Sequence, residues 1–279
     1  MVNVSKPVVE KGQEAERTLS MDISGLAEKT FNDKERVIRV FGIAQILIIN
    51  EMRNINLGDE KNIKMAPEGN KDGYHNRLHV FDVLKTAMEL ANRLKISEKD
   101  KELLFIAAAG HDVGFNVRYD NNEVLGAMIT YKVMSQEGFR HSYVHGYFQD
   151  WSPSDIKTVG DIIVRGTTTY PLEGGKLGFQ QKPETRLEKI ISLADVYNFF
   201  RIAGDDRNFF ELGNALNKEI AAKNGKEYKG PTAGSDAYAI QLLKNYKIND
   251  AGYDKQFLAT LEHKRQENIN ALEARSINF

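Results

Sequence analysis

Residues 103–114 read LLFIAAAGHDVG, an apolar run that ends in the adjacent pair His111-Asp112. A helix with seven consecutive apolar residues has no polar face, so we expect it to be buried on most sides. An ionised carboxylate at the end of such a helix is costly unless a cation or hydrogen-bond donors compensate it. The pair therefore indicates a metal site. The alternative is that Asp112 serves the turn at Gly114, with His111 hydrogen-bonded beside it.

Outward from this run, apolar residues recur at steps of three and four, and strand alternation is absent. We therefore predict an all-α fold, with Ser97 as the N-cap of the helix that carries the apolar run. The polar, weakly periodic residues 1–30 are predicted to form a flexible N-terminal arm, and residues 31–279 a single domain. Helices are expected over residues 33–53, 74–94, 97–114, 122–137, 153–165, 184–203, 209–222, 235–246 and 253–274.

Composition narrows the function further. The chain has 279 residues, 38 Lys and Arg, 39 Asp and Glu, and a formal net charge of −1, so no global field would attract a nucleic-acid duplex or an anionic membrane. It has no cysteine, which excludes disulfides and thiolate ligands and leaves His and carboxylates to bind metals. We see neither a secretory signal nor a membrane anchor and expect a cytoplasmic protein.

Two other helical segments carry residues of the same chemical type. His75 and His79 are four residues apart and would share one helix face, although surface histidines show the same spacing. Asp195 lies within the apolar stretch RLEKIISLADVYNFF, where an ion pair with Arg186 or Arg201 is the alternative to a metal. Three separated helices with such residues in apolar surroundings favour one shared site.

The strings YHNRLHVFDV, AAAGHDVGF and LADVYNF resemble the three signatures of the HD-domain metal-dependent phosphohydrolases. The first string is especially similar to that of the cyclic-nucleotide phosphodiesterases. The resemblance implies a single HD-type helical bundle with extra N- and C-terminal helices, and a general acid at His75. A metal-activated water would attack the phosphoester. The metal ligands that it implies are His79, His111, Asp112 and Asp195.

The chain departs from related bacterial sequences at Asn122-Glu123, where many carry a His-Glu pair. Glu123 would either approach the metal waters or be solvated near the surface. His141 and His145 are candidates for a second metal, with ordinary packing or surface roles as the alternative. His263 is expected on the surface. Asp82, three residues after His79, would either support that ligand or be solvated.

The resemblance implies one or two divalent ions per chain, drawn from Mn, Zn, Ni, Co, Fe or Mg. The substrate is expected to be a small phosphoester, namely a nucleotide or cyclic nucleotide, and a homodimer is left open. The alternatives are a di-iron HD-fold oxygenase and a catalytically weak nucleotide sensor. Arg165 directly precedes, and Thr167 begins, a Gly- and Pro-rich loop over residues 166–184 that could border the pocket. Residues expected to contact substrate are Asn76, Glu123, Arg165 and Thr167.

Overall fold

The computed structural model describes residues 6–51, 74–116, 122–145, 151–167, 182–201, 209–223 and 225–277. Every regular element in these ranges is a helix and none is a strand, which confirms the all-α prediction. None of the described helices is long and apolar enough to cross a membrane. The predicted loops over residues 54–73 and 168–181 lie outside the described part of the chain.

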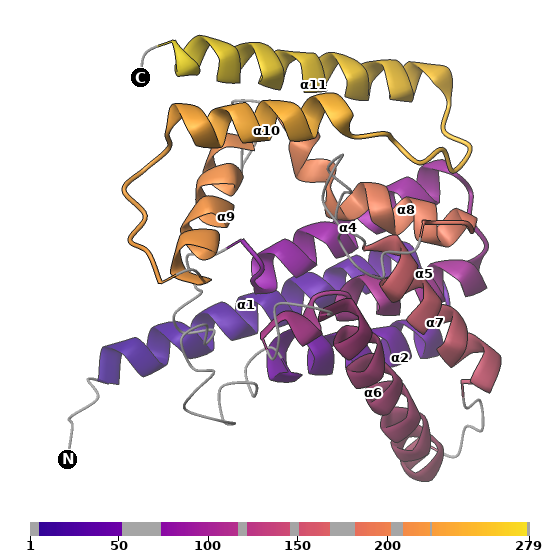
Figure 1. The fold of residues 1–279 in the computed structure, drawn as a ribbon. Coiled ribbons are helices and arrows are strands. Elements are labelled where there is room, and N and C mark those ends of the chain that lie inside the picture. The colour runs from indigo at the N-terminus through magenta and orange to yellow at the C-terminus, as the bar shows by residue number, and fades with distance from the viewer. Residues whose placement is uncertain are drawn as a thin grey trace.

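The α-helices are α1 (Lys6–Thr30), α2 (Lys34–Gln45), α4 (Arg77–Arg93), α5 (Glu98–Gly110), α6 (Asn122–His145), α7 (Pro153–Gly166), α8 (Arg186–Asp195), α9 (Phe209–Lys223), α10 (Ala233–Asn245) and α11 (Lys255–Ser276). Three shorter elements are η1, a π-helix (Ile46–Glu51), and the 3-10 turns η4 (Val113–Asn116) and η5 (Tyr197–Phe200). Figure 1 shows α1 along one side of the molecule and α11 along the opposite side.

Several helices begin where the residue types predict. Ser97 is the N-cap of α5, and its hydroxyl accepts a hydrogen bond from the amide of Asp100, as expected. Thr185 and Glu188 form a reciprocal capping box at the start of α8. The predicted helix to Gly114 instead ends at Gly110, because the chain turns at His111-Asp112 before η4. That turn takes the pair out of the helix and allows it to face the neighbouring helices.

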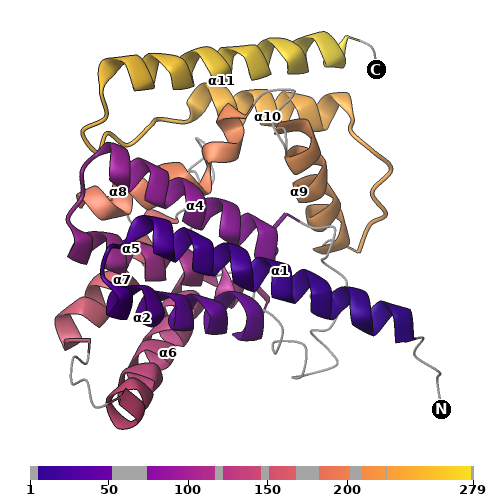
Figure 2. The same cartoon turned by 180° about the vertical axis from the view of Figure 1, so that it is seen from behind.

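The predicted flexible arm over residues 1–30 is the main error in the fold prediction. Residues 6–30 form α1, and Leu19, Ile23 and Ala27 are buried in the main hydrophobic core. These three residues are spaced by four, so they lie along one face of the helix. The polar residues around them hid this narrow apolar face in the sequence. Figure 2 shows α1 lying beside α2 and α4.

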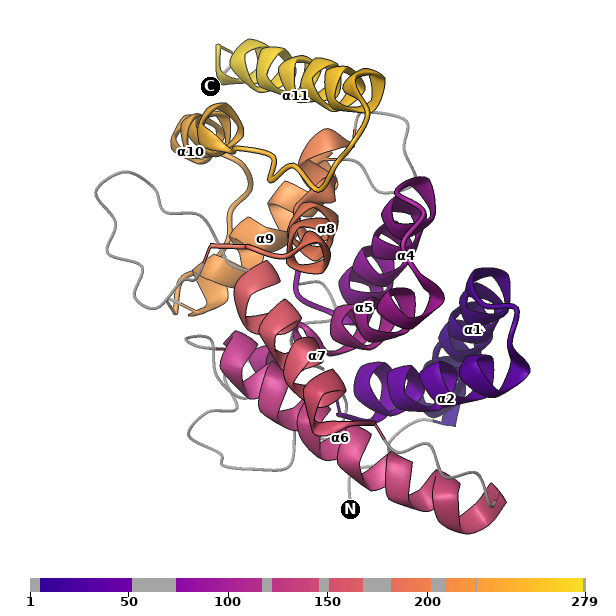
Figure 3. The same ribbon diagram turned by 90° about the vertical axis from the view of Figure 1, so that its right-hand side faces the viewer.

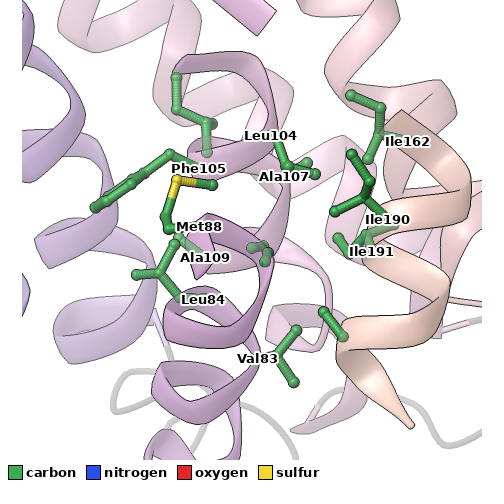
Figure 4. Packing of buried hydrophobic residues seen from close by; sticks show 14 of the residues in the cluster. Val83, Leu84, Met88, Leu104, Phe105, Ala107, Ala109, Ile162, Ile190 and Ile191 are labelled. Carbon is green, nitrogen blue, oxygen red and sulfur yellow. The ribbon is translucent and has the colours of Figure 1, made fainter. Parts of the chain in front are cut away.

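The main core is built around α5, as the sequence predicts. All residues from Glu102 to Gly110 are buried, and α5 packs against α2, α4 and α7. Figure 4 shows side chains of α4, α5, α7 and α8 meeting in this core, among them Met88, Phe105, Ile162 and Ile190. Burial on all sides fixes the end of α5, and with it the position of His111-Asp112.

Helix α6 crosses the His111-Asp112 turn at very short range. A Cβ at Gly126 would lie 2.8 Å from the carbonyl oxygen of Gly110 and 2.9 Å from that of His111. A Cβ at Gly110 would lie 2.0 Å from the hydroxyl oxygen of Thr130. Since real Cβ atoms do not approach backbone this closely, a side chain at position 126 would force the two segments apart, whereas one at position 110 would require the side chain of Thr130 to move. The contact places the first turn of α6 beside the site described below.

The C-terminal helices have a small hydrophobic cluster of their own. It joins Phe209 of α9, Leu243 of α10, and Ile269 and Leu272 of α11. Asp236 of α10 is buried and accepts a hydrogen bond from Nε of Arg275 of α11 at 2.7 Å. Figure 3 shows α10 and α11 side by side, with α9 below α10. Both α9 and α11 reach the main body, because each contacts η5 and Leu261 of α11 lies in the main core.

Candidate metal centre and its neighbouring histidine

Three helix ends bring four ligand-type side chains together. His79 lies in the first turn of α4, His111 and Asp112 directly follow α5, and Asp195 is the last residue of α8. These helices pack against one another around the main core. The sequence-based expectation that separated segments share one site therefore agrees with their placement.

The facing atoms of this cluster lie close to one another. Nε2 of His79 is 3.3 Å from Oδ2 of Asp112 and 3.2 Å from Oδ1 of Asp195. Nε2 of His111 is 3.3 Å and 3.6 Å from the same two oxygens. The ligand atoms of His79, His111 and Asp195 all lie within 4.8 Å of one another. Two imidazole nitrogens and one oxygen of Asp195 thus form a candidate metal group, and Oδ2 of Asp112 lies 3.3 Å from both nitrogens.

Buried atoms of this cluster make no hydrogen bonds in the structure: both ring nitrogens of His79, Nε2 of His111 and Oδ2 of Asp112. Buried polar atoms are nearly always hydrogen-bonded, because an unsatisfied one keeps its full desolvation penalty. A divalent cation between the two aspartates would bind the Nε2 lone pairs of His79 and His111 and compensate the two carboxylates, whereas Nδ1 of His79 lies on the other side of its ring. The donor set, mixed imidazole and carboxylate, fits first-row divalent metals.

A backbone contact orients His111 toward the same point. Its Nδ1 donates a hydrogen bond to the carbonyl oxygen of Ala108 at 2.8 Å, which leaves Nε2 as the nitrogen that carries the lone pair. Metal-binding histidines are commonly held in this way by their second nitrogen. The last turn of α5 therefore fixes both the ring orientation and the tautomer that a metal requires.

The ionisable groups of the cluster strongly shift one another's pKa values. Burial alone would raise the pKa of Asp195, but His111 and His79 lower that pKa to about 2. Burial also opposes ionisation of Asp112, yet the charges of His111 and His75 hold its pKa well below the ordinary value. Conversely, Asp112 and Asp195 raise the pKa of His111 against the effect of burial. Without a metal, the carboxylates depend on protonated imidazoles for compensation.

His75 lies next to the cluster but has a different partner. Its ring is 5.7 Å from that of His79, and its Nδ1 lies 2.6 Å from Oε1 of Glu219 in α9. The other oxygen of Glu219 accepts hydrogen bonds from the amides of Tyr74 and His75 at 2.9 Å and 3.0 Å. Burial would lower the pKa of His75, but Asp112 and Glu219 raise it overall. His75 is therefore oriented and biased toward its protonated form.

Two expected substrate contacts lie in the first turns of α4 and α6. Asn76 is the N-cap of α4, and its side-chain oxygen accepts hydrogen bonds from the amides of Leu78 and His79. Glu123 is half-buried at the start of α6. Burial raises its pKa, and Asp112 and Asp195 add to that effect. Glu123 thus lies near the cluster, whereas Asn76 holds the helix that presents His79.

The other substrate candidates lie at the end of α7. Arg165 donates a hydrogen bond to Glu184 at 2.6 Å. Thr167 is buried, and its hydroxyl donates to the carbonyl oxygen of Ile163. These contacts tie α7 to its own last turn and to the approach to α8. The structure thus shows helix-end contacts for both residues.

The remaining ligand-type residues are divided between described and undescribed parts of the chain. His141 and His145 fall within α6, but their side chains lie outside the described residues, so the second-metal hypothesis is untested. The side chain of His263 is 75% exposed, which confirms its surface assignment.

Asp82 lies 3.8 Å from Arg201, and Arg186 donates to the carbonyl oxygens of Leu94 and Ala251.

Glu219 is a residue of the site that the sequence analysis missed. It occupies the apolar stripe of α9, in register with Phe209, Leu212 and Leu216 at steps of three and four. An acid within an apolar stripe is the same signal that singled out Asp195. The local sequence gives it no prominence, because the polar residues Asn217 and Lys218 directly precede it.

Comparisons with known proteins give one match. Residues 78–199 match the family model described as HD domain, a range that contains His79, His111, Asp112 and Asp195. No curated protein and no solved structure matches the chain. The matched range includes the cluster but ends before α9, so Glu219 lies beyond it.

Proposed function

We propose that the chain, whose residues 78–199 match the HD domain model, is a metal-dependent phosphohydrolase that hydrolyses a nucleotide or cyclic nucleotide phosphodiester. The observation that carries this proposal is the buried cluster of His79, His111, Asp112 and Asp195. Ligand atoms of His79, His111 and Asp195 lie within 4.8 Å of one another, and Nε2 of both histidines and Oδ2 of Asp112 have no hydrogen-bond partner among the described residues. The HD family supplies the reaction class, and the arrangement of His75 supports the preference for a diester.

The four cluster residues would hold the divalent ion. When bound, such an ion polarises a phosphoryl oxygen and makes water a stronger nucleophile at neutral pH. The protein contributes a water-poor setting, since His79 and His111 are completely buried. Low polarity around the site strengthens each electrostatic contact with a phosphate.

His75 is proposed as the general acid. With Nδ1 bound to Glu219, Nε2 is the ring nitrogen that would donate a proton to the leaving alkoxide. The raised pKa keeps a larger fraction of His75 protonated near neutral pH. An alkoxide is a poor leaving group without a proton, so this arrangement suits esters of nucleoside hydroxyls.

Glu123 is proposed as a substrate contact at the edge of the cluster. Burial raises the pKa of its carboxyl group, and Asp112 and Asp195 add to this effect, so protonation, which lets the group donate a hydrogen bond to a phosphate oxygen, costs less there than in water. Asn76, Arg165 and Thr167 remain proposals for the same role, with side chains that also make the helix-end contacts described above. The structure thus supports Glu123 before the other three.

The proposal is tested by assaying purified full-length protein, stripped of metal and reloaded with Mn, Ni, Co, Zn, Fe or Mg. The substrates are bis(4-nitrophenyl) phosphate, cyclic nucleotides, linear dinucleotides and mononucleotides. We expect metal-dependent turnover of at least one diester. His75→Asn should reduce turnover of a nucleotide diester by about a hundredfold. It should reduce turnover of the aryl diester less, because 4-nitrophenolate leaves without protonation.

Asp161→Asn is the matched control, because Asp161 is exposed and pairs only with Lys157 in the same helix turn as far as the described contacts show. It should leave turnover unchanged. Absence of turnover with every metal and substrate would overturn the proposed activity. Tight nucleotide binding without turnover would then indicate a sensor, and two irons per chain with oxygen uptake would indicate an oxygenase.

A further inference from the structure

The metal cluster and Glu219, the residue that contacts His75, lie on helices that belong to two different hydrophobic clusters. The cluster residues extend from helices of the main core, whereas Glu219 extends from α9, which packs with the small C-terminal cluster. Glu219 and His75 are 144 residues apart in sequence. The position of the proposed acid therefore depends on how α9 is held.

Helix α9 has partners on two opposite sides. Phe210 and Glu219 are nine residues apart, which is half a turn in angle, so their side chains leave the helix in opposite directions. Along the axis the two positions are about 13 Å apart. Glu219 contacts His75 on one side, and the guanidinium of Arg275 lies over the ring of Phe210, 4.7 Å from its centre, on the other.

Arg275 is itself held by a buried carboxylate. It donates from Nε to Oδ2 of Asp236 at 2.7 Å and from Nη2 to Oδ1, a two-point contact that fixes the plane of the guanidinium. Asp236 is only 1% exposed. Arg275 therefore joins α9, α10 and α11 at one point, and its flat face packs against Phe210 in a defined orientation.

We propose that Arg275 is a positioning residue for His75, acting through α9 and Glu219. This inference rests on the proposed role of His75 as the general acid. Arg275 contacts neither the metal cluster nor His75, so its replacement should leave metal binding intact. It should instead loosen α9 and weaken the contacts of Glu219 with the ring of His75 and the amides of Tyr74 and His75.

The test is amide hydrogen exchange of the full-length chain, read at Tyr74 and His75, because both amides donate to Glu219. Arg275→Ala should speed their exchange toward the rates seen in Glu219→Ala, with unchanged metal content. Turnover of an alkyl diester should fall by about tenfold, and that of an aryl diester less. Exchange does not require turnover, so this readout stands even if the proposed function fails.

Glu273→Gln is the matched control. Glu273 pairs with Lys244 at 2.9 Å and so links the same two helices, α10 and α11, at an exposed position away from Phe210. It should change neither exchange nor turnover. Wild-type exchange at Tyr74 and His75 in Arg275→Ala would overturn the proposal. If that variant does not fold, Arg275→Lys decides, since it keeps the charge but loses the flat two-point contact; unchanged exchange there would also overturn the proposal.

Discussion

Asp236 and Asp112 are both buried carboxylates, at 1% and 5% exposure, but their surroundings differ. Asp236 lies among the C-terminal helices, and its two carboxylate oxygens accept hydrogen bonds from Nε and Nη2 of Arg275. Asp112 lies at the end of α5 and faces two imidazoles, and its Oδ2 makes no hydrogen bond. The chain supplies a permanent cation in one place and only titratable rings in the other.

This difference distinguishes a structural ion pair from a ligand site. An arginine remains charged at all ordinary pH values, so the Asp236 pair is complete within the chain. Imidazoles offer lone pairs to a metal only when they are neutral, and neutral imidazoles cannot compensate two carboxylates. Within the chain, the charges of Asp112 and Asp195 are therefore compensated only by protonated imidazoles, and an added divalent cation would take the place of those protons. Replacing each carboxylate should have opposite consequences for function and folding.

The largest expected effect is on turnover in Asp112→Asn. Loss of one charged ligand weakens the metal and its stabilisation of the transition state by several kcal/mol, and turnover should fall by about a thousandfold. The stability of the metal-free protein should change much less, because the carboxylate there lacks a permanent partner. Steady-state rates and urea unfolding of the stripped protein measure both. If Asp112→Asn kept the wild-type turnover rate but lost much of its stability, Asp112 would have the structural role that is assigned here to Asp236.

Asp236→Asn should show the converse. It leaves Arg275 without its carboxylate at a site where Asp236 was almost fully buried, and breaking such a pair costs about 3 kcal/mol. Urea unfolding measures this loss, with Asp161→Asn as a surface control. Metal content should be unchanged. A loss no larger than that of the control would show that the pair contributes little to folding.

The smallest expected effect is that of Glu219→Gln on the pH dependence of turnover. Like Asp112, Glu219 is a buried carboxylate whose partner is a titratable histidine. Burial lowers the pKa of His75, while Asp112 and Glu219 raise it above the ordinary value. The acid works while protonated, so activity should fall as pH rises through this raised pKa. Without the Glu219 charge the pKa decreases, and the alkaline limb of the pH–rate profile should move to lower pH. An unmoved limb would contradict the proposed pairing.

The raised pKa of His75 also makes the stability of the folded state decrease as pH rises. A group whose pKa is raised by folding stabilises the native state below its unfolded value, about 6.5 for histidine, and this contribution is lost as pH rises through the folded pKa. In Glu219→Gln that contribution should be smaller. Unfolding measured below and above neutral pH should therefore show a weaker pH dependence than in the wild type.

Most helices could be predicted from the sequence, because their apolar faces are wide and their caps are distinct. Ser97, for example, marks the start of α5 and forms the expected cap. Helix α1 was missed because, among its side chains that the structure describes, the buried apolar ones are Leu19, Ile23 and Ala27. Their burial comes from packing against other helices, and a short apolar stripe in a polar sequence does not show that a partner surface exists.

The site was predictable where an acid or histidine interrupts a long apolar run. Asp112 and Asp195 stood out for this reason, and the structure places them with His79 and His111. Arg186, a sequence-based alternative partner of Asp195, instead bonds backbone carbonyls of Leu94 and Ala251. Glu219 could not be assigned a partner, since no local pattern links it to a histidine 144 residues earlier.

The most direct test of the central claim is thermal unfolding of the stripped full-length protein during titration with Mn²⁺. If a divalent cation completes the cluster of His79, His111, Asp112 and Asp195, saturation at one hundred times the dissociation constant should stabilise the folded state by about 2.7 kcal/mol. The unfolding temperature should rise accordingly, and Asp112→Asn should greatly reduce the rise. An unfolding temperature that does not respond to Mn²⁺, Zn²⁺, Ni²⁺, Co²⁺, Fe²⁺ or Mg²⁺ would contradict the account.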